Sequence, residues 1–338
     1  MSSDGPIRTI VSRRALVAGA AAGTVALASA PASAQRCPAT PPARTKGPLV
    51  WMDMDQHELD EAYDQAVYAF NGRTISGRRE ARYKVALAAI GAPERVAYGA
   101  ADIEKVDIWK TRRPNAAPIL VFLHGGQWLG GRSRQAAYIA EAVVKAGAHF
   151  VSVDFSNVKE TNGDLMPMVD QCRRAVAWTY QNAAKFGGDP NSIYLSGFSS
   201  GAHLGGCVVI TDWEKQKRPP DILKGAILCS GIYDLKPVRL SKRSSYLTID
   251  DATEQALSAQ RHIDKVRIPL ILTTGTLETP EFQRQSRDFA AALEAAGKRV
   301  RHVAGTGHNH FEMQESFGNP YGVAGRAALE MMGLASAA

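Results

Sequence analysis

The chain has 338 residues, of which 45% are hydrophobic and 22% charged, and its formal net charge is +7 at pH 7. Its lysines and arginines are scattered without a long basic run, which argues against a nucleic-acid-binding protein. The four cysteines show neither a CxxC pair nor the spacing of zinc ligands. Three of them lie in apolar stretches, which favours buried thiols over disulfides: Cys172, Cys207 and Cys229.

Residues 1–34 predict an export signal peptide. Three arginines precede a charge-free stretch at 15–30, and a small-x-small cleavage site ends at Ala34. The charge-free stretch is too short and too weakly apolar for a lasting membrane anchor. The segment SRRALV, 12–17, is similar to a twin-arginine signal, the alternative being an ordinary secretory signal that carries two arginines. We therefore expect a periplasmic or secreted protein.

The elements of the mature chain follow a Pro-rich segment, 35–50, that we interpret as a linker to a single domain at 51–338. Apolar spacing predicts an amphipathic helix over 55–70 with Asp55 as its N-cap, and an Arg-rich helical stretch then ends at Gly91. Further on, strands are predicted at 95–98, 105–110, 119–123, 149–153, 193–195, 226–229, 270–274 and 300–303, and helices at 133–146, 168–186, 200–210 and 281–296.

This alternation predicts an α/β fold. Apolar β-runs separated by helical patterns are typical of a mostly parallel central sheet with helices on both of its faces. Residues 232–267 lack a clear strand pattern and fall between two predicted strands, so we expect them to form a short cap insertion.

A Gly-x-Ser-x-Gly motif, 197–201, lies between the predicted strand 193–195 and the predicted helix that follows. In that position the glycines permit a tight turn that presents Ser199 above the edge of the sheet, as a nucleophile elbow does. His203, one turn into the helix, is expected to pack beneath this elbow. The motif predicts a nucleophilic serine.

The segment HGGQW, 124–128, directly follows the predicted strand 119–123. A Gly-Gly turn exposes backbone N–H groups, which acyl transfer needs for its oxyanion. We expect the amides of Gly125, Gly126 and Ser200 to serve this purpose. His124 is interpreted as a brace for the loop. Trp128 either packs in the core or forms a wall of the acyl pocket, and we group it with Phe198 as a candidate substrate-binding residue.

An acid and a base are expected after the serine, in the chain order Ser…Asp/Glu…His. Glu278 stands at the carboxyl end of the predicted strand 270–274, where α/β sheets place functional groups, whereas Glu281 lies in the first turn of a helix and suits its dipole. We favour Glu278 as the acid. Two histidines, His308 and His310, follow the last strand and are the candidates for the base.

With these motifs the chain resembles the arylformamidase (kynurenine formamidase-like) group of the α/β-hydrolases. The resemblance extends from about residue 54 to the C-terminal helix, and its stretches are LDEAYDQAVY (59–68), VAYGAADIEKVDIW (96–109), HGGQW, GFSSGAHL (197–204), ETPEFQRQS (278–286) and NHFE (309–312). It implies an α/β-hydrolase fold with Ser199 as nucleophile, Glu278 as acid and His310 as base, His308 being the alternative. Phe198 departs from the family, since many relatives have histidine there.

The resemblance implies a serine hydrolase that cleaves an ester or amide bond of a small, aromatic substrate through an acyl-enzyme, without a cofactor or metal. The export signal departs from the intracellular pathway of kynurenine formation, so the resemblance supports the hydrolytic chemistry rather than N-formylkynurenine as the substrate. A broad-specificity carboxylesterase for xenobiotic or plant-derived esters is the alternative. The complete Ser-Glu-His set argues against a third possibility, a non-catalytic binding protein on a hydrolase scaffold.

Four cations lie within eight residues at the start of the expected cap: Lys236, Arg239, Lys242 and Arg243. They form either a solvated basic face or, for one or two of them, a site for a carboxylate on the substrate. The second interpretation predicts a preference for anionic substrates that salt weakens.

Overall fold

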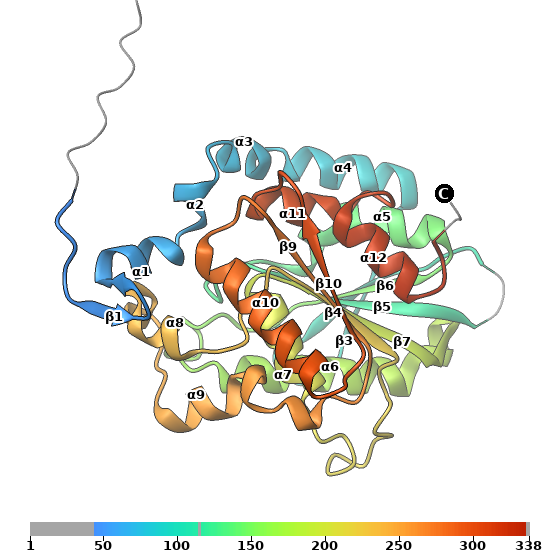
Figure 1. Cartoon of the computed structure of the whole chain (residues 1–338). Coiled ribbons are helices and arrows are strands. Elements are labelled where there is room, and N and C mark those ends of the chain that lie inside the picture. Colours follow the sequence, from blue (N-terminus) through green and yellow to red (C-terminus); the bar gives the residue numbers. More distant parts are fainter. Residues whose placement is uncertain (1–43, 114–115, 336–338) are drawn as a thin grey trace, which may run out of the picture. The chain divides into compact units, whose positions relative to one another are not determined.

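Eight strands form one sheet in the order β10-β9-β8-β7-β5-β6-β4-β3 (Figure 1). The computed structural model describes residues 44–113 and 116–335, and Lys46–Ala338 is its main compact unit, while the predicted signal, 1–34, lies outside the described residues. The strands are β3 (Glu94–Ala97), β4 (Lys105–Trp109), β5 (Ala117–Leu123), β6 (His149–Val153), β7 (Gly188–Phe198), β8 (Gly225–Cys229), β9 (Leu270–Gly275) and β10 (Val300–Gly305).

The predicted, mostly parallel sheet is confirmed. Neighbouring strands run parallel along β10-β9-β8-β7-β5-β6, and at the other end of this sheet β4 pairs antiparallel with both β6 and β3. The apolar run of β5 is buried on both faces, because Val121 and Leu123 belong to the core on one side of the sheet and Leu120 and Phe122 to the core on the other. Such two-sided burial requires helices on both faces.

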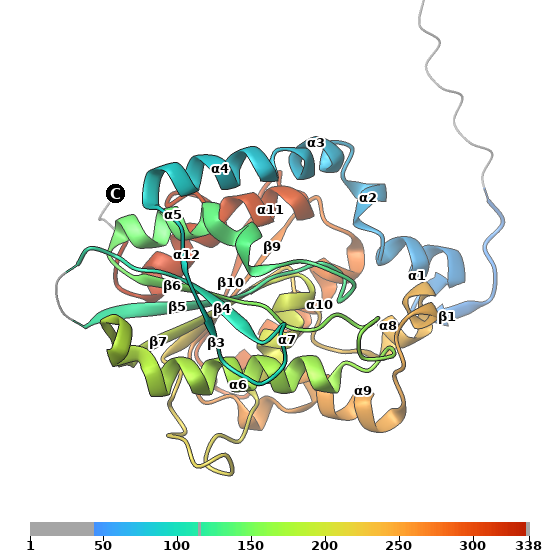
Figure 2. The ribbon, with the colours of Figure 1, turned by 180° about the vertical axis from the view of Figure 1, so that it is seen from behind.

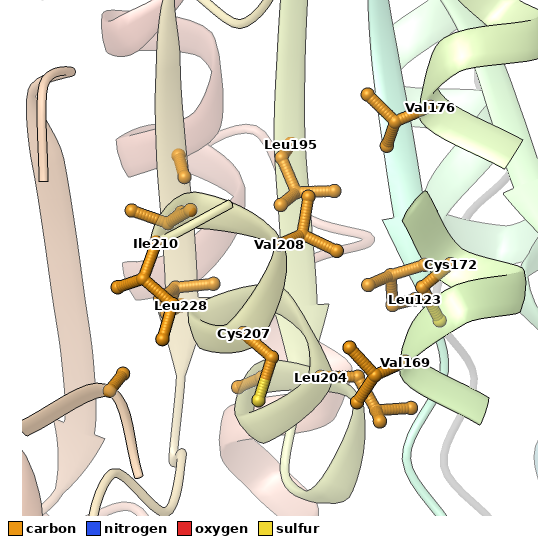
Figure 3. Packing of buried hydrophobic residues seen from close by; sticks show 14 of the residues in the cluster. Leu123, Val169, Cys172, Val176, Leu195, Leu204, Cys207, Val208, Ile210 and Leu228 are labelled. Carbon is orange, nitrogen blue, oxygen red and sulfur yellow. The ribbon is translucent and has the colours of Figure 1, made fainter. Parts of the chain in front are cut away.

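Helices cover both faces of the sheet (Figures 1 and 2). The core of one face includes side chains of α6 (Met166–Asn182), α7 (Ser200–Val209) and α10 (Pro280–Ala295). Figure 3 shows Cys207 and Val208 of α7 among side chains of β7, β8 and α6. The other core includes side chains of α4 (Arg79–Ile90), α5 (Ala137–Ala146), α11 (His310–Ser316) and α12 (Val323–Met331). None of the helices in the described ranges is long and apolar enough to cross a membrane.

Beyond residue 94 the predicted elements are found, with shifted boundaries. The strand predicted at 193–195 is the buried centre of the longer β7, which begins at Gly188. Two predicted helices combine an α-helix with a 3-10 turn, namely η1 (Ser133–Ala136) before α5 and η2 (Ala183–Phe186) after α6. The three cysteines of the apolar stretches are buried free thiols.

The single helix predicted over 55–70 is wrong. A short hairpin of β1 (Leu49–Trp51) and β2 (Met54–Asp55) leads into α1 (Gln56–Ala62), α2 (Gln65–Tyr68) and α3 (Gly72–Gly77). Asp55 is the N-cap of α1, as predicted. The helix then breaks because the side chain of Asp64 caps a second helix at the amide of Ala66. Phe70, which the periodicity assigns to the apolar face, is 94% exposed.

The predicted cap, 232–267, forms short helices and no strand, within the described residues. Its elements are α8 (Lys236–Leu240), η3 (Lys242–Ser245), α9 (Asp251–Leu257), η4 (Ala259–Arg261) and η5 (Ile263–Lys265), all between β8 and β9.

The strand order reverses direction at β5. The chain passes from β5 to β6 on one side and then returns through α6 to β7 on the other. At such a switch point the loops that follow adjacent strands diverge, which leaves a crevice at the carboxyl ends of the strands. The loops after β5 and β7 are those that carry the HGGQW and Gly-x-Ser-x-Gly motifs.

Candidate active site

Ser199 occupies a strained turn between β7 and α7. Its backbone has φ 56° and ψ −123°, in the left-handed region that a side chain rarely adopts. Glycine is needed on either side, because a Cβ on Gly197 would lie 2.5 Å from the carbonyl oxygen of Gly201 and one on Gly201 would collide with the carbonyl oxygen of Leu123. The turn is therefore held tightly against the end of β5, as a nucleophile elbow requires.

Of the two candidate histidines, the structure brings His310 to the serine. Its Nε2 lies 2.9 Å from Ser199 Oγ. His308 lies in the preceding turn, where its Nδ1 is 2.9 Å from the carbonyl oxygen of Thr306. His310 is the first residue of α11, which Asn309 caps by accepting hydrogen bonds from the amides of the first turn.

Glu278 completes the set. Its Oε2 lies 2.7 Å from Nδ1 of His310, and its Oε1 accepts hydrogen bonds from Ser230 Oγ at 2.6 Å and from the amide of Gly275 at 2.8 Å. The carboxylate is 1% exposed, and these bonds fix its orientation towards the imidazole. Sequence reasoning missed Ser230, although its position directly after β8, next to the strands that carry Ser199 and Glu278, marks the same sheet edge.

Glu281, the alternative acid, belongs to another network. Both of its oxygens accept hydrogen bonds from Arg284, at 2.6 and 2.8 Å. It also accepts hydrogen bonds from Trp51 Nε1 and from the hydroxyl of Tyr63, each at 3.2 Å. This carboxylate therefore ties the N-terminal segment to α10 and does not orient the histidine.

The Gly-Gly loop lies against the elbow. A Cβ on Gly125 would stand 3.1 Å from Cβ of Ser199, and Gly126 has φ 135°, a backbone conformation suited to glycine. Among residues 44–113 and 116–335, no acceptor is found for the amides of Gly125, Gly126 or Ser200. These three N–H groups are available to an oxyanion formed at Ser199.

His124 supports this loop and also lines the active-site cavity. Its ring stacks on Phe155 with centroids 4.1 Å apart, and its Nδ1 lies 3.0 Å from the carbonyl oxygen of Gly125. Burial lowers the pKa of His124, so its ring is neutral near pH 7. The side chain positions the loop, as interpreted from the sequence.

Of the two aromatic residues predicted to bind substrate, Phe198 and Trp128, one lies at the cavity and the other in the core. Phe198 lines the active-site cavity, and its ring centroid is 4.6 Å from that of His310. Trp128 is 1% exposed, is not among the cavity-lining residues, and donates a hydrogen bond from Nε1 to Nδ1 of His203. It packs in the core, which is the first of the two interpretations of this residue. His203 in turn lies 3.0 Å from the carbonyl oxygen of Leu257 through Nε2.

A cavity of about 320 Å³ opens onto Ser199 and His310. Two arginines, Arg79 and Arg243, contribute to its wall, and no aspartate or glutamate does so in the described chain. Aromatic side chains and glutamines supply much of the remaining lining: Phe122, Phe198, Phe311, Tyr138, Gln65, Gln127, Gln135 and Gln314. The described ranges contain no group of three or more His, Cys, Asp or Glu residues that could hold a metal ion.

Comparisons with known proteins agree with this architecture. The BD-FAE family model matches residues 106–293, more than half of the chain. The chain is 29% identical over 301 residues to kynurenine formamidase of Danio rerio, a match that covers 84% of this chain and 98% of that protein. It is 25% identical over 244 residues to isoprenylcysteine alpha-carbonyl methylesterase ICME of Arabidopsis thaliana, covering 64% and 56% of the two chains.

Solved structures show the same fold. A propionate-bound thermophilic esterase, Est2 of Thermogutta terrifontis, has a TM-score of 0.59 at 25% identity, covering 74% of this chain and 97% of that one. A putative thioesterase of Silicibacter sp. has a TM-score of 0.67 at 19% identity, covering 83% and 99%. The chain therefore belongs to the BD-FAE family, in an arylformamidase-like group of the α/β-hydrolases.

Proposed function

We propose that the protein hydrolyses a carboxylic ester or amide bond of a small, aromatic substrate, with Ser199 as the nucleophile. One observation carries the proposal: Ser199, His310 and Glu278, from three distant segments, form a continuous series of hydrogen bonds of 2.9 and 2.7 Å beside a cavity. A nucleophile, a base and an acid that orients the base are the groups that acyl transfer requires.

The reaction has two halves. As Ser199 Oγ attacks the substrate carbonyl, its proton passes to Nε2 of His310, and Glu278 stabilises the imidazolium through Nδ1. The oxyanion accepts hydrogen bonds from the amides of Gly125, Gly126 and Ser200. Its collapse breaks the bond to the leaving group, which takes the proton from His310 and departs.

Water then completes the turnover. His310 removes a proton from a water molecule, which attacks the acyl carbon of the acyl-Ser199 ester. The second tetrahedral intermediate expels Ser199 Oγ, which regains its proton from His310, and the carboxylic acid is released. The consumption of one water per bond cleaved balances the reaction.

The aromatic part of the proposal has two supports. The kynurenine formamidase of Danio rerio is a relative over most of both chains. The rings of Phe122, Phe198, Phe311 and Tyr138 line the cavity, and aromatic walls favour aromatic ligands. The second candidate function, a carboxylesterase of broad specificity, is favoured by the likeness to Est2 and to the methylesterase ICME.

Labelling with a fluorophosphonate probe tests the nucleophile, because such probes react with an activated serine. The wild type should be labelled at Ser199, and Ser199→Ala should lose both the label and the hydrolysis of phenyl acetate. Phenyl formate, formanilide, phenyl acetate and ethyl butyrate, assayed side by side, separate an aryl formyl hydrolase from a broad esterase. An unlabelled wild-type protein that hydrolyses none of them would leave only the non-catalytic scaffold.

We also propose that the protein is exported, to the periplasm or the medium. The support is the sequence of residues 1–34 alone, with its paired arginines, charge-free stretch and small-x-small site.

A further inference from the structure

Arg243 is a buried guanidinium in the wall of the active-site cavity. The residue is 3% exposed and lies in η3, within the predicted cap. Within the described part of the chain its guanidinium forms no ion pair and makes one hydrogen bond, from Nη2 to the carbonyl oxygen of Tyr63 at 2.8 Å. A guanidinium has five N–H donors, so most of its hydrogen-bonding capacity is unused.

The neighbouring cations of this basic stretch have other roles. Arg239 pairs with Asp251 and Glu254, and the ammonium of Lys242 lies 3.0 Å from Asp64. Lys236 is exposed. Of the four cations that the sequence grouped, Arg243 alone lines the cavity.

The surroundings of Arg243 hold it in place without an ion pair in the described chain. The charge of Asp64 acts on Arg243, but that carboxylate is paired with the ammonium of Lys242 at 3.0 Å. Its guanidinium carbon lies 5.4, 5.6 and 6.0 Å from the ring centroids of Tyr63, Trp128 and Phe282. Burial lowers the pKa of Arg243, yet a guanidinium stays protonated in proteins. A buried cation that forms no ion pair is costly, and such a cost is expected of a group whose partner arrives with the ligand.

Gln65 adds a second unsatisfied group to the same cavity. This first residue of α2 is 4% exposed, and neither its Nε2 nor its Oε1 has a hydrogen-bond partner among the described residues. Buried amides are almost always hydrogen-bonded, so two open positions on one side chain point to a missing ligand. The break between α1 and α2 places Gln65 here, because Asp64 caps the new helix.

We propose that Arg243 and Gln65 form a subsite that binds a carboxylate on the substrate. The guanidinium and the Gln65 amide group donate hydrogen bonds to the carboxylate oxygens, and the absence of acidic residues from the described cavity lining leaves the bound charge unopposed. This proposal rests on the proposed function, since it names the substrate class of the same site: anionic aryl esters or amides.

The test compares a neutral and an anionic substrate in matched variants. The substrates are phenyl acetate and 3-carboxyphenyl acetate, and the quantity is the ratio of their kcat/KM values. Arg243→Met should lower the anionic-to-neutral ratio by about 10- to 100-fold, the scale of a lost charge-assisted hydrogen bond, and Gln65→Leu by a few-fold. Arg239→Met, an arginine paired on the same stretch, is the control and should leave the ratio unchanged.

A second measurement avoids turnover. In the Ser199→Ala background, benzoate should raise the melting temperature more than benzyl alcohol does, and Arg243→Met should abolish the difference. If Arg243→Met has a folding defect, Gln65→Leu provides the test of the subsite instead. In this variant the difference in melting temperature between benzoate and benzyl alcohol should be smaller than in the Ser199→Ala background alone.

The two proposals fail in different ways. If phenyl acetate hydrolysis depends on Ser199 while Arg243→Met and Gln65→Leu keep the wild-type ratio, the carboxylate subsite is wrong and the serine mechanism stands. If Ser199→Ala keeps full activity, the proposed function itself is wrong.

Discussion

At the scale of single residues, the proposed catalysis depends on which of two neighbours of the same type reaches the site. His308 and His310 are two positions apart, and Ser199 and Ser200 are adjacent in the elbow. His310 is at the serine because Asn309 ends the preceding turn and starts α11, so that the next side chain points into the site. Ser230 and the amide of Gly275 then hold Glu278 behind it.

This arrangement predicts unequal effects for the two histidines. His310→Ala should lower kcat for phenyl acetate by roughly 10³- to 10⁴-fold, the scale for breaking a triad that acts as a unit. His308→Ala should change kcat by less than about threefold, because its ring contacts a turn carbonyl instead of the serine. Steady-state kinetics with both purified variants measure this, and a larger loss in His308→Ala would reverse the assignment of the base.

At the scale of elements, a buried histidine joins three segments. His203 on α7 accepts a hydrogen bond from Trp128 on the oxyanion loop and contacts Leu257 at the end of α9. Because Nδ1 accepts from the indole, Nε2 carries the proton that is donated to the carbonyl oxygen of Leu257. Burial lowers the pKa of His203 to about 4, so the folded protein holds it neutral.

The same histidine makes stability depend on pH. The ordinary pKa of histidine, 6.5, applies to His203 in the unfolded chain. As the pH falls, the unfolded chain therefore takes up a proton at His203 near pH 6.5, whereas the folded protein does so only near pH 4. The contribution of His203 to the free energy of unfolding is greatest above pH 6.5. It declines as the pH falls, by about 2 kcal/mol between pH 7 and pH 5.

Urea unfolding at pH 7 and pH 5 measures this effect. Residue 203 cannot titrate in His203→Gln. Between pH 7 and pH 5 the free energy of unfolding of this variant should therefore fall by about 2 kcal/mol less than that of the wild type, although we expect the variant to be less stable at pH 7. The exposed His57 provides the control, and His57→Gln should behave like the wild type. If the wild type and His203→Gln lose the same free energy of unfolding between pH 7 and pH 5, burial does not lower the pKa of His203 in the folded protein.

At the scale of the whole molecule, the site is assembled from both ends of the chain. The N-terminal segment supplies Gln65, and α11 near the C-terminus supplies His310. Loops that follow strands of the sheet supply Ser199 and Glu278, and the segment between β8 and β9 supplies Arg243. The N-terminal segment is tied to α10 through Glu281 and to α11 through Asn71, whose side chain bonds Asn309 and Glu312.

The export proposal is also tested on the whole chain. Full-length protein, produced in a bacterium with a working twin-arginine pathway, should appear in the periplasm with residues 1–34 removed. Replacing Arg13 and Arg14 together by lysine should retain it in the cytoplasm, because the pathway requires the arginine pair. Cell fractionation with N-terminal sequencing gives the result, and unchanged export of the double variant would indicate an ordinary secretory signal.

The parallel sheet and the elbow followed from the sequence alone. Buried β-runs and helical periodicity are local signals. The glycines two positions before and after Ser199 likewise indicate that other backbone segments approach too closely to leave room for a Cβ. The prediction of one helix over 55–70 was wrong because it followed the periodicity of the apolar residues alone. In the structure Asp64 instead caps a second helix.

The choices between equivalent side chains were decided by the tertiary structure. Glu278 and Glu281 lie three residues apart, and the sequence favoured Glu278 from its place after the strand. The contact between Glu278 and His310 exists only in the fold, because the two residues come from different segments. Arg243 is one of four cations in the basic stretch 236–243, and only the fold buries it in the wall of the cavity without an ion pair in the described chain. Local patterns determine which elements form, whereas charge pairing and burial depend on distant segments that meet only after folding.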